Sequence, residues 1–70
     1  MEKYYVGFER AMLLKTISEK KLSPLVLEKT SMIIKHIREH KGHQMADNKA
    51  QELRLIIETC KTEQEVLENL

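Results

Sequence analysis

The sequence predicts an all-α protein, a small three- to four-helix antiparallel bundle that is expected to be oligomeric. The first observation is the scarcity of residues that interrupt helices, because the 70 residues include only two glycines and one proline. The second is that β-branched residues nowhere alternate with polar ones as they do in half-buried strands. The third is that apolar side chains recur with a helical period, while the helix formers glutamate, lysine and leucine are abundant. Residues 1–70 are expected to form a single helical domain.

The first helix is expected over about residues 2–20, and its apolar side chains surround almost its entire circumference. One broad sector of the helical wheel contains Tyr4, Tyr5, Phe8 and Met12. The opposite side contains Val6, Leu13 and Ile17. A helix that is apolar on every side has to be covered on several sides, and a 70-residue chain has too little protein to do so. We therefore expect the first sector to form an interface with a protein partner or with a second copy of the chain.

The second helix is expected over about residues 24–41. Ser23 is a good cap for the free amides of a helix start, and Pro24 fits the first helical position. One apolar stripe, roughly 120° wide and suited to face a core, contains Val26, Leu27, Ile33, Ile34 and Ile37. Leu25 and Met32 lie on the opposite side and are expected to stay exposed.

The third helix is expected over about residues 47–60, after a short connection that follows Gly42. Asp47 is a residue type that caps helix N-termini, and a start at Gln44 is the alternative. The apolar positions of this segment follow a 4-3-4-3 spacing, which is typical of a helix that packs against its neighbours at a shallow angle. These positions are Ala46, Ala50, Leu53, Ile57 and Cys60.

A fourth, short helix is expected over about residues 63–69. Thr62 followed three residues later by Glu65 matches the capping-box pattern, in which two side chains satisfy backbone amides at a helix start. The alternative is that the third helix continues without a break to the last residue. The capping box favours the break.

The composition favours an intracellular protein, and the cytoplasm is the expected location. Cys60 is the only cysteine, so the chain cannot form the internal disulfides that small secreted domains commonly use. The apolar positions near the N-terminus are interrupted by charged residues, which is unlike a signal peptide. No run of residues is apolar for long enough to span a bilayer, so no membrane association is expected.

The charge is unevenly distributed, with a formal charge of +3 on residues 29–49 and −3 on residues 50–70. The segment KHIREHKGHQ, residues 35–44, contains all three histidines. It offers a candidate patch for anionic ligands, formed by Lys35, His36, Arg38, His40, Lys41 and His43. Basic residues before a glycine are also an ordinary helix ending, since cations favour the negative end of the helix dipole. Both interpretations stay open from the sequence.

Neither a metal site nor a catalytic site is expected. His36 and His40 lie four residues apart, a spacing that can chelate a divalent ion. Further ligands could come from His43, Asp47 or Cys60. The chain lacks the CxxC and HExxH motifs that would make such a site specific, so we expect no metal and no cofactor. No nucleophile and base stand at a recognisable spacing either, so we expect that the protein is not an enzyme.

The segment LSPLVLEKTSMIIKHI, residues 22–37, is similar to the second helix of the small bacterial sporulation-type aspartyl-phosphate phosphatases. Members of that family are helical hairpins, and a serine and an acidic residue on this helix carry their recognition motif. The resemblance covers less than a quarter of the chain, and Ile34 stands at the acidic position. No phosphatase activity is therefore expected from it.

These features predict a small non-enzymatic regulatory or adaptor protein that acts by protein–protein interaction, with a size and composition that suit a bacterial or phage-encoded inhibitor. The alternative is an oligomeric module that binds a phosphorylated ligand, a signalling nucleotide or nucleic acid through the basic patch. Nucleic acid is less favoured than a protein partner, because the aromatic residues that would stack on bases all lie in the first helix. Charge-driven binding should weaken with salt and strengthen as histidine protonates, whereas an apolar interface should show neither trend strongly.

Overall fold

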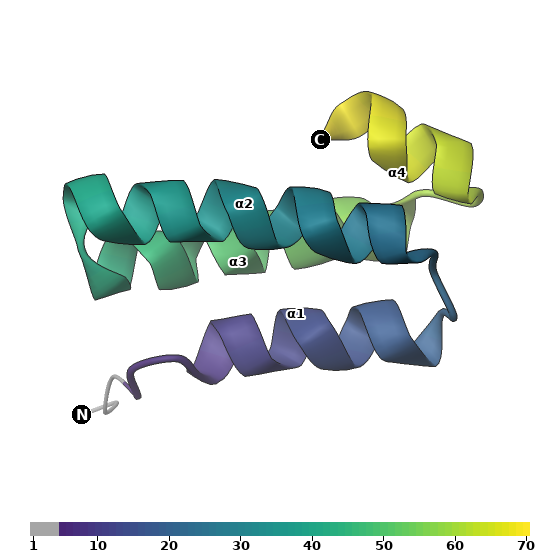
Figure 1. Ribbon diagram of the computed structural model, residues 1–70. Helices are drawn as coiled ribbons and strands as arrows, with labels where there is room; N and C mark the ends of the chain where they lie inside the picture. The colour runs from purple at the N-terminus through teal and green to yellow at the C-terminus, as the bar shows by residue number, and fades with distance from the viewer. Residues whose placement is uncertain (1–4) are drawn as a thin grey trace.

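The computed structural model describes residues 5–70, and within that range the chain forms four helices and no strand. The expected all-α class is confirmed, and successive helices reverse direction as in an antiparallel bundle (Figure 1). The elements are α1 (Phe8–Glu19), α2 (Pro24–Lys41), α3 (His43–Thr59) and α4 (Glu63–Asn69). None of the helices between residues 5 and 70 has the length and apolar character needed to cross a bilayer.

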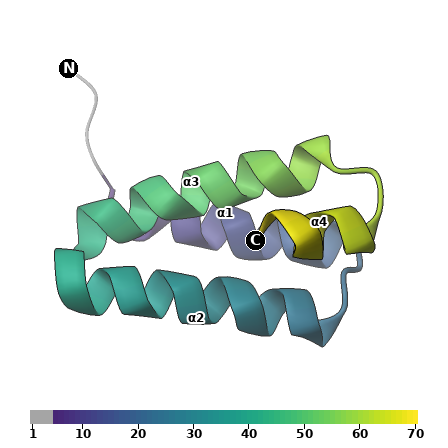
Figure 2. The same ribbon diagram turned by 90° about the horizontal axis from the view of Figure 1, so that it is seen from above.

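The central element is α3, because α1 and α2 both pack along it while hardly contacting each other. α2 and α3 form a helical hairpin, and α1 and α4 lie on opposite faces of this hairpin (Figures 1 and 2). All four helices contribute side chains to one core, which contains Leu13, Ile17, Val26, Ala50, Leu53, Ile57 and Val66. The seam between α1 and α2 is consequently not closed by direct packing of these two helices.

The predicted apolar seam of α3 is confirmed at four of its five positions. The almost completely buried residues are Ala46, Ala50, Leu53 and Ile57. Cys60 differs, because it follows the end of α3 with an extended backbone and is only half-buried. The two alanines have no side chain beyond Cβ, which allows a neighbouring helix to approach closely.

α2 buries less of its predicted stripe than expected. Val26 is fully buried, whereas Leu27 is exposed. The stripe is half-buried at Ile33, Ile34 and Ile37. The second buried residue of α2 is Thr30, whose hydroxyl donates to the backbone carbonyls of Val26 and Leu27, both at 3.0 Å. Thr30 can therefore be buried without an unsatisfied polar atom, which an apolar pattern does not reveal. Leu25 and Met32 are exposed, as expected.

The first helix begins at Phe8, so its expected start near residue 2 is wrong for the described residues. Gly7 occupies the N-cap with φ 84° and ψ −2°, a left-handed conformation that interrupts a helix and that glycine adopts at least cost. The turn before it is closed by a hydrogen bond from the Phe8 N–H to the Tyr5 carbonyl at 3.1 Å. The remaining part of the expected helix, residues 2–4, lies outside the described residues.

α1 ends in a Schellman motif whose left-handed residue is a lysine. The Lys21 N–H donates to the Ser18 carbonyl at 3.0 Å, and the Leu22 N–H donates to the Ile17 carbonyl at 3.2 Å. These two bonds define the motif, and Leu22 packs against the core that contains Ile17. Lys21 has φ 53°, a conformation that is costly for any residue with a Cβ.

Ser23 and Pro24 begin α2 as predicted, but Ser23 does not act as the expected cap. Its side chain makes no capping hydrogen bond, and its backbone N–H donates to Oε1 of Glu63 at the start of α4. This hydrogen bond favours the charged carboxylate and holds the pKa of Glu63 below its ordinary value of 4.5, with a smaller contribution from the Ser23 side chain. The bond fixes the start of α2 to the start of α4.

A single residue, Gly42, connects α2 to α3, so the third helix begins beside the alternative start at Gln44 and not near Asp47. Gly42 has φ 90° and ψ 177°, a backbone region that is essentially restricted to glycine. Apart from adjoining residues, no heavy atom lies within 4 Å of the position that a Cβ would take. The backbone conformation alone therefore requires glycine. Because one residue reverses the chain, α3 begins at His43 and Asp47 lies inside the helix.

The predicted break before α4 is confirmed, since α3 ends at Thr59 and α4 begins at Glu63. The Thr62 hydroxyl accepts a hydrogen bond from the Glu65 N–H at 3.2 Å, as in a capping box. The reciprocal bond is displaced by one residue, because the Glu65 carboxylate accepts from the Lys61 N–H at 3.4 Å.

The Lys21→Gly variant is expected to be more stable than the wild-type protein. Glycine removes the steric cost of the positive φ at this position, which is about 1 kcal/mol for a single residue. Urea unfolding followed by circular dichroism measures the free energy of unfolding of both proteins. Lys20→Gly is the control and should be destabilised, because Lys20 has a right-handed helical backbone that gains nothing from glycine and its Nζ donates to the Ile57 carbonyl at 2.8 Å. A Lys21→Gly variant that loses stability would contradict the assignment of the motif.

The Glu63→Gln variant is expected to lose stability at neutral pH and to match the wild type in strong acid. A carboxylate whose pKa is lowered in the folded state stabilises that state above its unfolded pKa, and this stabilisation disappears as the pH falls through the folded pKa. Urea unfolding at both pH values gives the difference. Glu58→Gln is the control and should show no such pH-dependent gap, since Glu58 makes no hydrogen bond or ion pair with a described residue.

Candidate functional site

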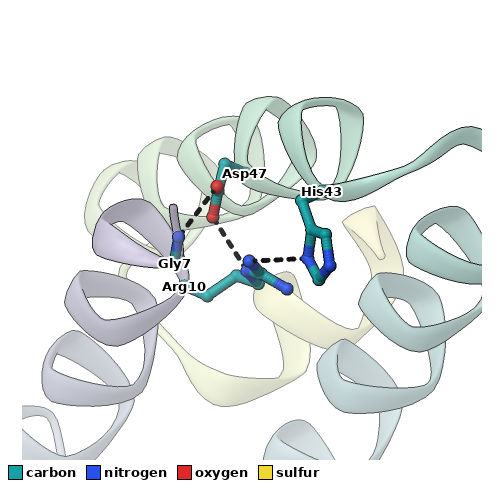
Figure 3. A network of polar contacts seen from close by, with 4 residues as sticks. All are labelled: Gly7, Arg10, His43 and Asp47. Atoms are coloured by element: carbon teal, nitrogen blue, oxygen red, sulfur yellow. Dashed lines mark hydrogen bonds and ion pairs between the residues drawn. The ribbon is translucent and has the colours of Figure 1, made fainter. Parts of the chain in front are cut away.

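A buried network joins the start of α1 to α3, and its centre is Asp47 (Figure 3). Asp47 is 1% exposed, and its Oδ2 accepts a hydrogen bond from the Gly7 N–H at 3.0 Å. Its Oδ1 accepts from Nε of Arg10 at 2.8 Å, which makes a charge-assisted pair. Nη2 of Arg10 also lies 3.3 Å from Nδ1 of His43, on the first turn of α3. Both carboxylate oxygens thus accept hydrogen bonds from α1 or its N-cap. This arrangement suits a residue that holds α1 on α3 better than it suits a catalytic base.

A second ion pair connects the same two helices. Nη2 of Arg54 on α3 lies 3.3 Å from Oε2 of Glu9 on α1, and both side chains are largely buried. The pair is imperfect, because Glu9 Oε2 and Arg54 Nε make no hydrogen bond within the described part of the chain. Its charges nevertheless cancel, so it leaves no net charge beside the start of α1.

The predicted interface residues lie mainly on the surface around the start of α1. Tyr4 lies outside the described residues. Tyr5 and Phe8 are exposed, Phe8 by 54%, whereas Met12 is half-buried. Val6, which the wheel placed on the opposite side, is also exposed, because this segment is not helical. We call Tyr5, Val6 and Phe8 the N-terminal apolar surface.

All six residues of the predicted basic patch are exposed, on the last turns of α2 and at the start of α3. The His36 and His40 rings lie together, with their centroids 4.4 Å apart. His43 contacts Arg10, and Lys41 lies beside Met45 in a separate hollow. Lys35 and Arg38 line a hollow together with Arg10 of α1, the residue that also contacts His43. That the six residues act as one site for anionic ligands stays a prediction.

Residues 5–70 contain no group of three or more histidine, cysteine, aspartate or glutamate side chains placed to hold a metal ion. Within these residues, no third metal-binding side chain lies beside the paired rings of His36 and His40, whereas structural zinc sites use four ligands. Asp47, named above as a further ligand, is engaged by Arg10.

An open groove lies between α1 and α2, as expected where two helices pack on a third and hardly contact each other. Its first part has a volume of about 200 Å3 and is lined by Arg10, Leu13, Leu14, Thr30, Ser31, Ile34, Lys35 and Arg38. It continues past Leu14 into a second hollow, lined also by Ile17, Ser18, Lys21, Leu22, Ser23, Pro24 and Leu27. We call these two hollows together the α1–α2 groove.

The α1–α2 groove combines an apolar floor with positive charge. No aspartate or glutamate is among its lining residues. Within the described chain, Lys21, Lys35 and Arg38 make no ion pair. This combination of apolar and basic side chains makes the groove suited to binding.

Sequence reasoning found Lys35 and Arg38 but missed the other members of this groove. Arg10 belongs to a different helix, 25 residues before Lys35 in the sequence. The available signal was that Leu14 lies off the core stripe of α1. Only the way that α1 and α2 diverge on α3 shows that these positions share a surface.

Comparisons of the chain with protein-family models, with curated proteins and with solved structures found no match. What the protein does therefore has to be inferred from its own surfaces. The two surfaces that stand out are the N-terminal apolar surface and the α1–α2 groove.

The Asp47→Asn variant is expected to be severely destabilised, by about 3–5 kcal/mol, because it leaves the Arg10 guanidinium without its buried counter-charge. Such a loss is comparable to the whole stability that a core of this size supplies, about 3–5 kcal/mol. Circular dichroism at increasing urea concentration measures it.

The matched control for this variant is Glu52→Gln, on the same helix. Glu52 pairs with Lys49 at 3.3 Å on the surface, and such exposed pairs contribute less than about 1 kcal/mol. If Asp47→Asn were as stable as Glu52→Gln, the buried network would not be what positions α1.

Proposed function

We propose that the protein is a small, non-enzymatic regulatory or adaptor protein that acts by binding protein chains in the cytoplasm of a bacterium or a phage-infected cell. The observation that carries this proposal is the N-terminal apolar surface. Tyr5, Val6 and Phe8 lie within four consecutive positions, and each residue is more than half exposed. Contiguous exposed apolar side chains, aromatic ones above all, are typical of protein interfaces.

A second copy of the chain is the partner that this surface fits best. Two-fold dimers place the same patch of both subunits in contact, so the patch must be complementary to itself. An uncharged patch meets this condition, and the charge of Glu9, the residue after Phe8, is neutralised by Arg54. Burial of one large apolar side chain stabilises a complex by about 1.5–3 kcal/mol, so Phe8 from both copies makes a substantial contribution in so small a protein.

The alternative function is binding of an anionic ligand, such as a phosphorylated metabolite or a nucleotide. The observation that favours it is that Arg10, Lys35 and Arg38 lie on one groove. The lining of this groove is largely apolar and contains no aromatic side chain for a base. Steep salt dependence of binding to a free nucleotide would support this alternative.

The Phe8→Ser variant is expected to dissociate the dimer and to leave the helix content unchanged, because Phe8 is exposed in the single chain. Native mass spectrometry and sedimentation velocity over a range of protein concentrations measure the subunit number.

Leu55→Ser is the control, because Leu55 on α3 is also 54% exposed but lies far along the chain from the N-terminal apolar surface. This variant should remain dimeric. A wild-type protein that stays monomeric at all concentrations would overturn self-association through this surface.

A further inference from the structure

We infer that the α1–α2 groove binds an acidic amphipathic helix of a partner protein. The inference builds on the proposed protein-binding function and gives the chain a second surface, distinct from the N-terminal apolar surface. An adaptor of this kind would pair with itself through one surface and hold its target in the other.

The floor of the groove contains apolar side chains that the fold leaves uncovered. Leu14 of α1 is 51% exposed, and Leu27 of α2 is also exposed, although both line the seam between their helices. Ile34 is half-buried beside them. Thr30 adds no unsatisfied hydroxyl to the floor, because its Oγ1 is bonded to the backbone of its own helix. Apolar side chains from a partner would remove this area from water.

The charge of the groove selects an acidic partner. Lys21, Lys35 and Arg38 have no counter-ion within the described chain. Arg10 is held in place by Asp47, so its orientation costs no additional entropy when a ligand binds. A surface with three cations that are unpaired within the described chain, and with no lining carboxylate, repels its own copy, which makes pairing of two grooves unfavourable.

The dimensions suit the side chains of a helix that lies across the top of the groove. α1 has 12 residues, so the groove beside it extends for about 18 Å, or about three turns of a bound helix. The hollow of about 200 Å3 is too small for a whole helix, whose diameter is about 10 Å, but it accepts individual side chains. Apolar anchors at i, i+3 and i+7 are the usual pattern for this mode of binding.

The acidic α4 of a second copy fits less well. Its apolar residue Val66 is almost completely buried, and Leu67 and Leu70 also pack against the core of their own chain. Exchange of α4 would therefore expose as much apolar surface as it covered. A nucleic acid is disfavoured by the absence of aromatic side chains from the groove lining.

The test uses the full-length protein and a labelled synthetic peptide of about 16 residues, long enough to be helical when bound. The peptide carries leucines at i, i+3 and i+7 spacing and glutamates at the other positions. A second peptide carries lysine in place of every glutamate. Fluorescence anisotropy is expected to show that the acidic peptide binds about tenfold or more tightly than the basic one, with an affinity that falls as salt is added.

Two substitutions locate the binding site. Lys35→Glu with Arg38→Glu should weaken binding of the acidic peptide about tenfold or more, whereas Lys29→Glu, exposed on α2 outside the groove, should have little effect. Leu14→Ser should weaken it as well. Its control is Leu25→Ser, since Leu25 is 48% exposed on α2 and does not line the groove.

Several results would overturn the inference: no binding of the acidic peptide, equal binding of both peptides, or tighter binding of a single-stranded RNA oligonucleotide. The Phe8→Ser variant could also remain dimeric. If adding Lys35→Glu and Arg38→Glu to that variant then dissociates the dimer, a second copy occupies the groove instead. Failure of the two proposals is distinguishable. If the protein binds the peptide but is monomeric at every concentration, only the proposal of self-association is rejected. If the protein forms a dimer that depends on Phe8 but does not bind the peptide, only the proposal for the α1–α2 groove is rejected.

Discussion

The buried carboxylate of Asp47 is the interaction on which the arrangement of α1 depends. It accepts the N–H of Gly7 and the Nε of Arg10, so it fixes both the left-handed residue before α1 and a side chain in its first turn. A charge that is 1% exposed is tolerated only when it is paired and hydrogen-bonded. The same contact that joins α1 to α3 also places the Arg10 guanidinium at the α1–α2 groove, which couples the stability of the fold to the charge of its surface.

The two candidate surfaces follow from how few helices share one core. Three helices around α3 cover it, but α1 and α2 do not cover each other, which leaves the groove. The interruption at Gly7 takes Tyr5 and Val6 out of α1 and leaves them exposed beside Phe8. One surface is neutral and aromatic and the other is cationic and aliphatic, so they differ in the partners that they can accept.

The parts of the fold that were predictable are those with local causes. Ser23 and Pro24 signal the start of α2, Thr62 and Glu65 signal the start of α4, and the spacing of α3 signals its buried seam. The role of Asp47 was not predictable, because its partners lie 40 and 37 residues away and aspartate is also a common cap. The place of Arg10 beside Lys35 and Arg38 was not predictable for a related reason, since these residues belong to different helices.

Because Gly42 alone connects α2 to α3, the φ and ψ angles of this one residue determine whether the two helices form a hairpin. If Gly42 took up helical angles, α2 and α3 would merge into one continuous helix from Pro24 to Thr59, about 54 Å long. In that extended form the buried face of α3 could be covered only by α1 and α2 of another chain, which is the geometry of a domain-swapped dimer. The positive φ of Gly42 therefore keeps the core within a single chain.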